Sequence, residues 1–340
     1  MEKRYFILFA VCIFLACQKH DAVFKAKHTF FRMDTVVEVT VVVSGRENAD
    51  KGKRITETWQ AIDSLLEDFE VRFSQTCGGS EVLAVNRKED SSRILSPILT
   101  EMISTGLRYG DTLDGMFDIT ILPVKELWGF GEKDTVKEVI PESAAIIRAL
   151  QRVDYRDVKI DTLERTIHFQ DDDVVIDVGG IAKGFSLREM ARQLDALGYT
   201  DYLIVAGGDI IGKGGRPDGE PWRVGIKHPR KENAIMGAFR LDSGSVVTSG
   251  DYERYWIKDG KRYHHIFNPH TGYSCGENQS LTIWCMDPII ADVLSTGLFC
   301  LSGEEILTFV EKRPLLECVV VDSSGTVLIS SGWKDKVQIL

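Results

Sequence analysis

The amino-acid sequence predicts an α+β protein in which mixed strands and helices form a single interlocked domain. Apolar residues fill short stretches such as 36–43 and 280–285, a pattern typical of strands. Between residues 55 and 72 the apolar positions instead recur every three or four residues, which indicates an amphipathic helix. The two kinds of segment do not alternate strictly, so a doubly wound parallel sheet is not favoured.

The other elements follow from the same patterns and from residues that begin or end helices. Pro141 precedes one helix and Gly198 ends another, in positions that these residues favour. Further helices are expected at 97–113, 142–150, 182–198, 288–301 and 304–313. Further strands are expected at 174–178, 202–206, 222–227, 245–249, 254–258, 263–267, 317–322 and 327–330. No linker-like break follows residue 30, so 31–340 is expected to be one domain.

Composition and charge are those of a globular protein. Of the 340 residues, 44% are apolar and 27% are charged, which provides enough apolar surface for a core. The formal net charge of −10 argues against a general nucleic-acid binder, because phosphate neutralisation needs a cationic face. The cysteines show no C-x-x-C spacing, so a zinc site is not indicated. Cys285 and Cys300 lie in apolar stretches and are expected to be core thiols.

The N-terminal segment has the features of a targeting signal. Residues 1–16 are expected to be a signal peptide, because a charged start precedes a run of twelve apolar residues that is too short to span a bilayer. The run ends in Ala16-Cys17, which resembles a bacterial lipobox. Cys17 is therefore expected to be lipidated, and residues 17–30 are expected to form the lipidated cysteine and a polar tether. The domain would lie in the periplasm, anchored to a membrane of the bacterial cell envelope. An ordinary signal peptide or an uncleaved anchor is the alternative.

A double glycine joins an expected strand to an expected helix. The stretch from Asp177 to Gly184 has the sequence D-V-G-G-I-A-K-G. Gly179 and Gly180 permit positive φ and a close approach of a ligand to the backbone. Lys183 falls in the first turn of the helix, where free N–H groups would favour a phosphate. A tight turn followed by a surface lysine explains the same residues without a ligand.

Two adjacent histidines, His264 and His265, lie in an expected strand. Successive side chains of a strand point to opposite faces, so only one of the two can face a given cleft. A histidine at this position is suited to proton transfer near neutral pH, but a structural role is the alternative.

One expected helix carries oxygen-donor side chains on one face. Asp292 and Thr296 are four residues apart, and Ser295 borders the same face. One carboxylate and two hydroxyls suit Mg²⁺ better than zinc. The alternative is an aspartate that caps or solvates the helix, with hydroxyls bonded to backbone carbonyls.

Taken together and in this order, these segments resemble the ApbE-type FAD:protein FMN transferases. The resemblance extends from Phe31 to about residue 330. Its blocks are F-R-M-D-T at 31–35, F-S at 73–74 with S-E at 80–81 and Asn86, G-M-F-D at 115–118, L-W-G-F at 127–130, the glycine turn at 177–184, G-G-D-I at 207–210, T-S-G-D-Y at 248–252, H-H-I-F-N-P-H-T-G at 264–272, and A-D-V-L-S-T at 291–296. Asp34 replaces the usual glycine of the first block.

The resemblance implies an α+β fold that binds FAD together with Mg²⁺ in a cleft. It implies an enzyme that cleaves the FAD pyrophosphate, attaches FMN through a phosphoester to Thr or Ser of a target protein and releases AMP. Acceptors of the family carry a D-G-x-T/S-G-A-T/S-like motif on subunits of membrane electron-transfer complexes. A domain anchored to the membrane would lie close to such acceptors.

The resemblance also assigns residues of this chain to roles. The metal ligands are Asp292, Ser295, Thr296 and the Gly180 carbonyl. Flavin and adenosine contacts fall on Met33, Thr76, Met116, Phe117, Asp118, Asp177, Lys183 and Ile266. His265 is the candidate base for the acceptor hydroxyl, and Asp251 is the second candidate. Thr76 stands where relatives commonly carry Tyr, so it leaves the expected flavin site without an aromatic cover.

Two other functions are compatible with the same residues. An FAD pyrophosphatase would use water in place of the protein hydroxyl and form FMN and AMP. A non-enzymatic flavin-binding lipoprotein would capture FAD without cleaving it. Release of AMP separates both enzymes from the binding protein, and the need for an acceptor protein separates the transferase from the pyrophosphatase.

Overall fold

The computed structural model describes residues 23–45, 48–88, 94–131 and 138–340. Its largest element is an eight-stranded sheet in which every neighbouring pair is antiparallel. In spatial order the strands are β1 (Val23–Arg32), β2 (Thr35–Ser44), β5 (Tyr202–Ala206), β6 (Asp209–Lys213), β9 (Ser243–Gly250), β12 (Asn278–Cys285), β13 (Leu316–Asp322) and β14 (Val327–Ile329).

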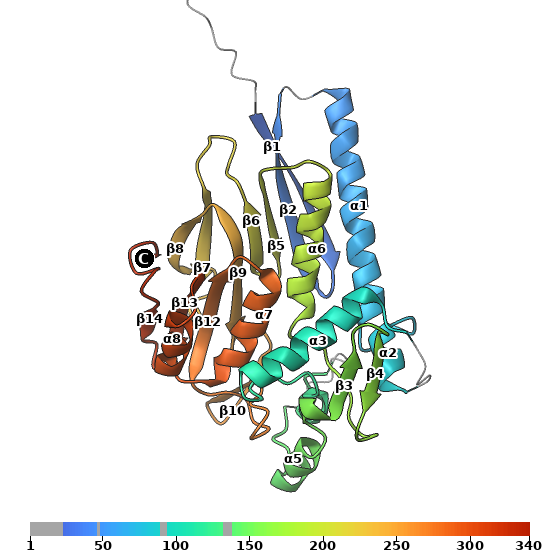
Figure 1. Ribbon diagram of the computed structural model, residues 1–340. Coiled ribbons are helices and arrows are strands. Elements are labelled where there is room, and N and C mark those ends of the chain that lie inside the picture. The colour runs from blue at the N-terminus through green and yellow to red at the C-terminus, as the bar shows by residue number, and fades with distance from the viewer. Residues whose placement is uncertain (1–22, 46–47, 89–93, 132–137) are drawn as a thin grey trace, which may run out of the picture.

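Helices cover one face of this sheet, and a small sheet covers part of the other (Figure 1). The helices are α1 (Ala49–Phe73), α6 (Ala182–Ala196), α7 (Pro288–Gly297) and α8 (Gly303–Glu311), with the 3₁₀ helix η2 (Leu298–Cys300) directly after α7. The small sheet has the order β15 (Gln338–Ile339), β8 (Ile235–Leu241) and β7 (Trp222–Lys227). Apolar side chains from both sheets, including those of Val246, Val319 and Phe239, pack between them.

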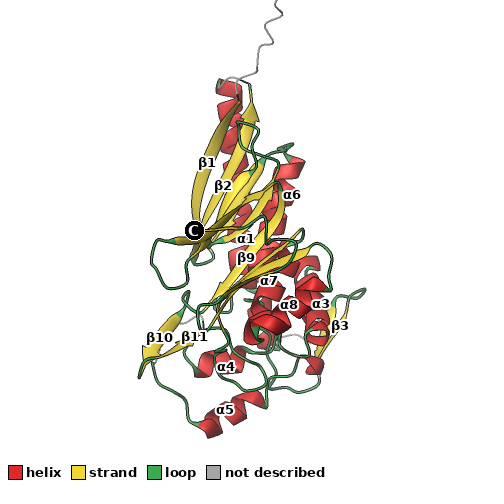
Figure 2. Cartoon of the chain, turned by 90° about the vertical axis from the view of Figure 1, so that its left-hand side faces the viewer, coloured by secondary structure: helices red, strands yellow, loops and turns green. Residues whose placement is uncertain are grey.

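A second group of elements lies below the main sheet, at the end opposite to the start of β1 (Figures 1 and 2). It contains α2 (Glu81–Asn86), α3 (Pro97–Thr112), α4 (Leu122–Leu127), α5 (Ser143–Leu150), η1 (Tyr155–Asp157), β3 (Val158–Asp161), β4 (Thr166–Phe169), β10 (Tyr255–Lys258) and β11 (Lys261–His264). Strands β10 and β11 pair only with each other. The buried aromatic rings of Trp128, Trp256, Tyr263 and Phe267 join them to α4 and α5.

Two local features place chain segments beside one another at the lower end of the main sheet. Met33 and Asp34 connect β1 to β2 with φ values of 55° and 54°, as a two-residue turn of a tight hairpin requires. Helices α6 and α7 approach closely at Gly184, where an added Cβ would lie 2.6 Å from the Pro288 carbonyl oxygen. A larger residue at this position would force the two helices apart.

The α+β class is confirmed, and most of the expected helices and strands are present. The structure corrects the expected strand at 174–178, which is extended but pairs with no strand. The side chain of Asn86 instead bonds both the N–H and the carbonyl of Ile176, at 2.7 and 2.8 Å. The expected strand at 263–267 ends at His264, as β11. Strands β3, β4, β6, β8 and β15 were not predicted from the sequence.

The boundary of the expected tether is also corrected. Strand β1 begins at Val23 and pairs with β2 over its whole length, so the fold starts before residue 30. Residues 1–16 and Cys17 lie outside the described residues. Within the described segments, no helix combines the length and the apolar character needed to cross a membrane.

Cys300 is not the free core thiol that the sequence indicated. It forms a disulfide with Cys275, with 4.9 Å between the two Cα atoms, while Cys285 is a buried free thiol as expected. No sequence pattern indicates this pair, because the cysteines come from a loop and from η2, which only tertiary packing brings together.

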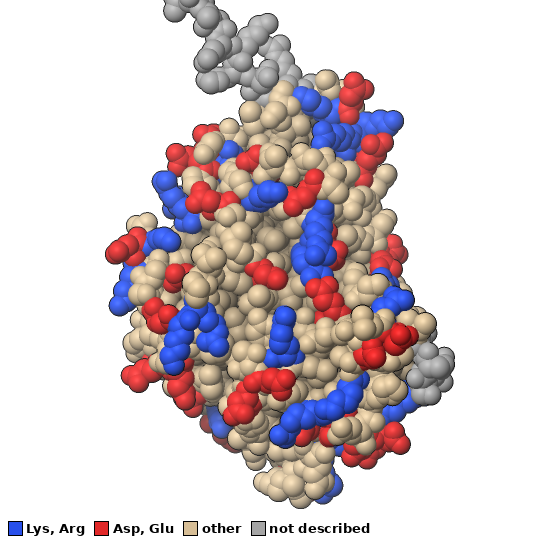
Figure 3. All heavy atoms as spheres, in the orientation of Figure 1, with Lys and Arg blue, Asp and Glu red and all other residues tan. Residues whose placement is uncertain are grey.

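Acidic and basic side chains are mixed on one face of the protein. On the face shown in Figure 3, acidic side chains lie among the basic ones over the whole area, with no broad basic patch. That face offers no continuous cationic surface for a nucleic-acid backbone.

Candidate functional site

A cavity of about 900 Å³ lies at the lower end of the main sheet. The β1–β2 turn, the end of α1, the glycine turn before α6, the end of β9 and one side of α7 all contribute to its wall. Most of the sequence-predicted site residues line it, namely Met33, Thr76, Met116, Phe117, Asp118, Asp177, Gly180, Lys183, His265, Ile266, Asp292 and Thr296. Asp251 and Ser295 do not.

Asp292 is buried where α7 meets the N-terminal end of α6. Its Oδ2 accepts a hydrogen bond of 2.7 Å from the Gly184 N–H, and the residue is 2% exposed. Lys183 forms an ion pair with Asp209, the first residue of β6. Burial raises the pKa of Asp292 to about 7, although the Lys183 ammonium acts in the opposite direction. Two buried carboxylates thus lie near one partly exposed cation, and when both are ionised the surplus of negative charge favours a bound cation.

The donor set around Asp292 fits a magnesium ion. Among the described residues, no hydrogen-bond donor is bonded to Asp292 Oδ1. Thr296 lies one turn further along α7, and a Cβ on Gly180 would lie 3.6 Å from Thr296 Cγ2, so the glycine turn lies beside that hydroxyl-bearing side chain. A carboxylate, a hydroxyl and a backbone carbonyl are the hard oxygen donors that Mg²⁺ prefers. The described segments hold no group of three or more His, Cys, Asp or Glu side chains suited to a metal ion.

Ser295 is oriented differently from the other predicted ligands. Its hydroxyl donates to the Asp292 carbonyl at 3.0 Å and accepts from the Ser249 hydroxyl at 3.0 Å. The residue is fully buried between α7 and β9. One acceptor lone pair of the Ser295 oxygen is left over, so the assignment of Ser295 as a ligand stays a prediction.

The two histidines face opposite ways, as the strand pattern predicts. His264 is buried away from the cavity, and its Nε2 lies 2.6 Å from the Cys275 carbonyl oxygen. His265 lines the cavity, with its Nδ1 3.3 Å from the Arg254 carbonyl oxygen. Because a carbonyl only accepts, Nδ1 carries the proton and Nε2 keeps a lone pair. Partial burial and the nearby His264, Lys125 and Arg254 lower the pKa of His265 to about 3, so the ring is neutral at physiological pH and is a weaker base than a free imidazole.

The glycine turn is held by an ion pair that the sequence did not reveal. Asp177 pairs with Lys125 of α4, and its Oδ1 accepts from the Gly179 N–H at 2.8 Å. Burial opposes the ionisation of Asp177, but the Lys125 ammonium outweighs it and the pKa is lowered. Neither glycine of the turn has the positive φ that was expected. At Gly180 an added Cβ would lie 3.1 Å from the Phe117 ring, so a larger residue would fit only if this ring moved slightly.

Asp118 and Asp251, two of the predicted site residues, are largely engaged with protein groups. Asp118 accepts from the Thr120 N–H and hydroxyl at 2.7 and 2.6 Å and from the Tyr155 N–H at 3.0 Å. Burial nevertheless raises the pKa of Asp118. Asp251 forms two hydrogen bonds with the Arg230 guanidinium, at 2.7 and 2.6 Å. Asp251 also does not line the cavity, so its role as a base stays a prediction that this arrangement does not favour.

Sequence reasoning missed three polar residues of the site. Lys125 and Arg254 line the cavity, and Asp209 pairs with Lys183 beneath it. Asp209 lies in the G-G-D-I block, so its motif was noticed although no role was assigned. Lys125 precedes the L-W-G-F block by two residues, and no local pattern distinguishes it from a surface lysine.

A model of the ApbE family matches residues 33–320 of this chain. The chain belongs to the ApbE family. The FAD:protein FMN transferase of Haemophilus influenzae is 29% identical over 330 residues, which cover 94% of this chain and 93% of that protein. The enzyme of the same name from Escherichia coli K12 is 28% identical over 280 residues, or 80% of this chain and 77% of that protein. The crystal structure of the ApbE protein from Thermotoga maritima matches with a TM-score of 0.81 and 30% identity, covering 92% of this chain and 99% of that one.

The part of the chain that matches the ApbE family includes both sides of the cavity. It contains the β1–β2 turn at Met33, the glycine turn, His265 and the face of α7 with Asp292 and Thr296. The ApbE fold therefore brings together, around one cavity, segments that are more than 250 residues apart in the sequence.

Proposed function

We propose that this protein is a magnesium-dependent FAD:protein FMN transferase. The observation that carries the proposal is the convergence of two kinds of group on one cavity. Oxygen donors that suit Mg²⁺ lie on α7, and a neutral histidine with an available Nε2 lines the same cavity from the loop after β11. The names of the relatives in the ApbE family support the same reaction.

The cavity offers separate surfaces for the parts of FAD. Met33, Phe117, Ile266 and Phe267 provide apolar wall for a flavin ring. Asp292, Thr296, the Gly180 carbonyl and Ser295 would hold Mg²⁺, which supplies positive charge and Lewis acidity at a bound pyrophosphate. Lys183 adds a cation beside the same helix. These groups offset the repulsion between an anionic phosphate and an incoming hydroxyl oxygen.

His265 is placed to accept the proton of the attacking hydroxyl. In the proposed reaction the Thr or Ser oxygen of the acceptor forms a bond to the phosphorus on the FMN side of FAD. The bond from that phosphorus to the bridging oxygen breaks, and AMP leaves with this oxygen. The acceptor proton passes to Nε2 of His265, while Nδ1 keeps its own proton and donates it in a hydrogen bond to the Arg254 carbonyl.

Mass spectrometry of a defined reaction tests the proposal. The protein is incubated with FAD and Mg²⁺, with an acceptor domain that carries the D-G-x-T/S-G-A-T/S-like motif, and with the same domain after its target Thr is replaced by Ala. We expect the mass of one FMN phosphoester on the first acceptor only, together with AMP. Failure to form AMP under any of these conditions leaves only flavin binding and rejects both enzymatic functions.

A second candidate activity is the hydrolysis of FAD to FMN and AMP. Thr76 lines the cavity and is exposed to solvent, so the rim at this position carries a small polar side chain rather than an aromatic ring. Water reaching the phosphate at this open rim would replace the acceptor hydroxyl. AMP and free FMN that form at the same rate with and without acceptor would support this activity over transfer.

We also propose that the domain is held at a membrane in the bacterial periplasm by a lipid on Cys17. The charged start, the apolar run and Ala16-Cys17 support this location, and β1 would begin six residues after the lipidated cysteine. Subunits of membrane electron-transfer complexes would then lie within reach as acceptors. Replacing Cys17 with Ser is expected to release the protein from the membrane fraction or leave it as a precursor, and retention with normal processing would contradict the anchor.

A further inference from the structure

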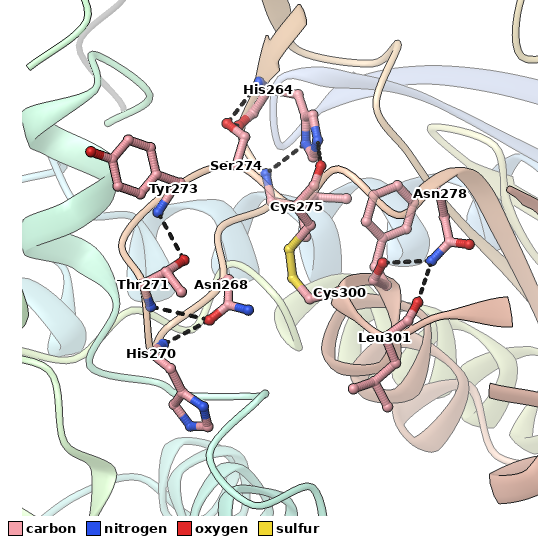
Figure 4. The surroundings of a disulfide bond; sticks show 12 residues. His264, Asn268, His270, Thr271, Tyr273, Ser274, Cys275, Asn278, Cys300 and Leu301 are labelled. Atoms are coloured by element: carbon pink, nitrogen blue, oxygen red, sulfur yellow. Dashed lines mark hydrogen bonds between the residues drawn. A yellow bond between two sulfur atoms is a disulfide. The ribbon is translucent and has the colours of Figure 1, made fainter. Parts of the chain in front are cut away.

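The loop that carries His265 is closed by contacts on both sides of that residue. His264 Nε2 donates to the Cys275 carbonyl at 2.6 Å, and His264 Nδ1 accepts from the Ile266 N–H at 3.3 Å. The Ser274 hydroxyl donates to the His264 carbonyl at 2.7 Å and accepts from the His264 N–H at 3.0 Å. Figure 4 shows these groups gathered around Cys275. One imidazole therefore joins the two ends of the loop and orders the backbone on both sides of His265.

The same loop is joined covalently to the end of the helix that carries the metal-ligand candidates. Cys275 is bonded to Cys300 of η2, and η2 directly follows α7. The amide of Asn278 donates to the carbonyls of Phe299 and Leu301, the residues on either side of Cys300, at 2.8 and 2.7 Å (Figure 4). The His264 ring also meets the Phe299 ring edge-on, with 5.7 Å between centroids.

These contacts matter because the main sheet does not hold the loop. Strand β11, which leads into His265, pairs only with β10 and has no partner in the eight-stranded sheet. The aromatic cluster around Trp128 holds this hairpin against α4 and α5, below the cavity. On the side of α7, the disulfide and the buried His264 provide the connection. His264 and the disulfide hold the loop against α7 together with the buried Ile266 side chain and the hydrogen bond of 3.1 Å from the Cys275 N–H to the Ile266 carbonyl, so they contribute to the position of His265 relative to Asp292.

We propose that His264 and the Cys275–Cys300 disulfide form a clamp that positions His265 for proton transfer. The inference rests on the proposed transferase function and adds two positioning elements to it. His264 acts through its neighbour, and the disulfide sets where the loop stands relative to α7. Loosening the clamp should slow the chemical step without removing any group that contacts FAD.

Two clamp variants are compared with a matched control variant and are also placed in a background that lacks His265. Cys275→Ser with Cys300→Ser removes the disulfide, and H264F keeps a ring against Phe299 but removes both hydrogen bonds. The control is C285S, because Cys285 is also a buried cysteine close to α7 but forms no disulfide. H265A supplies the background in which the base is absent. Far-ultraviolet circular dichroism and thermal unfolding establish that each variant is folded.

We expect the two clamp variants to lower kcat for FMN transfer by about 10- to 100-fold, since a misplacement of ~1 Å can cost a reaction 10²-fold. The dissociation constant of FAD should change by less than about threefold, and C285S should behave as wild type. In the H265A background the clamp variants should cause no further loss of kcat. Hydrogen exchange at residues 264–275 should become faster in the clamp variants only.

Other results overturn the inference. Unchanged kcat in both clamp variants rejects it, and so does a loss that is equally large in the H265A background, because the clamp would then not act through His265. If the C275S/C300S variant does not fold, wild-type protein treated with dithiothreitol replaces it. The reductant is oxidised to its cyclic disulfide as Cys275 and Cys300 become thiols, and kcat should fall by the same factor. If wild type forms no flavinylated acceptor at all, the proposed function fails, whereas active clamp variants beside an active wild type reject the clamp alone.

Discussion

The cavity has two sides that are built in different ways. On the helix side, defined by α6, α7, β6 and β9, Asp292 and Lys183 come from regular elements that pack against the main sheet. On the loop side, defined by residues 264–275, His265 follows a strand that pairs only with β10. Close backbone packing at Gly184 positions the first side, whereas a few side-chain contacts and a disulfide position the second.

In the proposed enzyme, this difference would combine rigid ion binding with an adjustable base. A buried carboxylate next to a cation tolerates little movement, because charges lose their partners when they separate. A histidine on a clamped loop can instead be displaced without disturbing the core. Substitutions on the helix side should therefore remove activity outright, and substitutions on the loop side should reduce it by degrees.

The largest expected effect tests the helix side. D292A should abolish FAD turnover, because it removes the only carboxylate of α7, and chelation of Mg²⁺ should abolish turnover by the wild type. The matched control is D287A, which removes the α7 cap at Ile289 and should cost about 0.5–2 kcal/mol of stability without loss of turnover. Release of AMP from FAD measures activity, and urea unfolding measures stability. Full activity of D292A in excess Mg²⁺ would mean that the Asp292 carboxylate has only a structural role in α7 and does not bind the metal.

The next effect tests the loop side. H265A should lower kcat by ~10²–10⁴-fold, the usual contribution of a general base, while FAD binding changes little. H270A is the control, since His270 lies in the same loop but does not line the cavity. Single-turnover kinetics separate the chemical step from binding. Equal and small losses in the two variants would show that the loop side supplies no base.

A smaller effect is expected at the rim between the two sides. T76Y should tighten FAD binding and slow acceptor-independent hydrolysis by about two- to tenfold, from the ~0.5–1.5 kcal/mol of a stacked aromatic pair. T76S keeps the hydroxyl and serves as the control. Fluorescence titration of FAD and release of FMN provide the two measurements. Identical binding and hydrolysis in T76Y and wild type would reject the open-rim argument and favour the transferase without a pyrophosphatase activity.

The smallest effect on activity is expected at Asp251, which belongs to neither the helix side nor the loop side of the cavity. D251N should change kcat by less than about twofold but lower stability by about 1–3 kcal/mol, because its hydrogen bonds to the Arg230 guanidinium are charge-assisted. R230Q should cost a similar amount, and the double variant should cost less than the sum of the two. Urea unfolding provides these values. A large loss of kcat in D251N with FAD affinity retained would restore Asp251 as the base.

The sequence by itself determined the local features of this protein. Helical spacing placed Asp292 and Thr296 on one face of α7, and strand alternation separated the directions of His264 and His265. Both follow from short-range geometry, since the repeat of a helix or strand depends only on neighbouring residues. The order of the motif blocks indicated the ApbE family before the fold was known, and the family match over residues 33–320 confirms it.

Only the tertiary structure decided which distant groups meet. The ion pairs Lys183–Asp209 and Lys125–Asp177 join residues 26 and 52 positions apart, and the disulfide joins residues 25 apart. The same is true of Arg230, whose guanidinium pairs with the carboxylate of Asp251. Such pairings depend on which elements pack together and at what distance. No local periodicity contains that information, because hydrophobic patterning specifies the buried face of an element but not its neighbour.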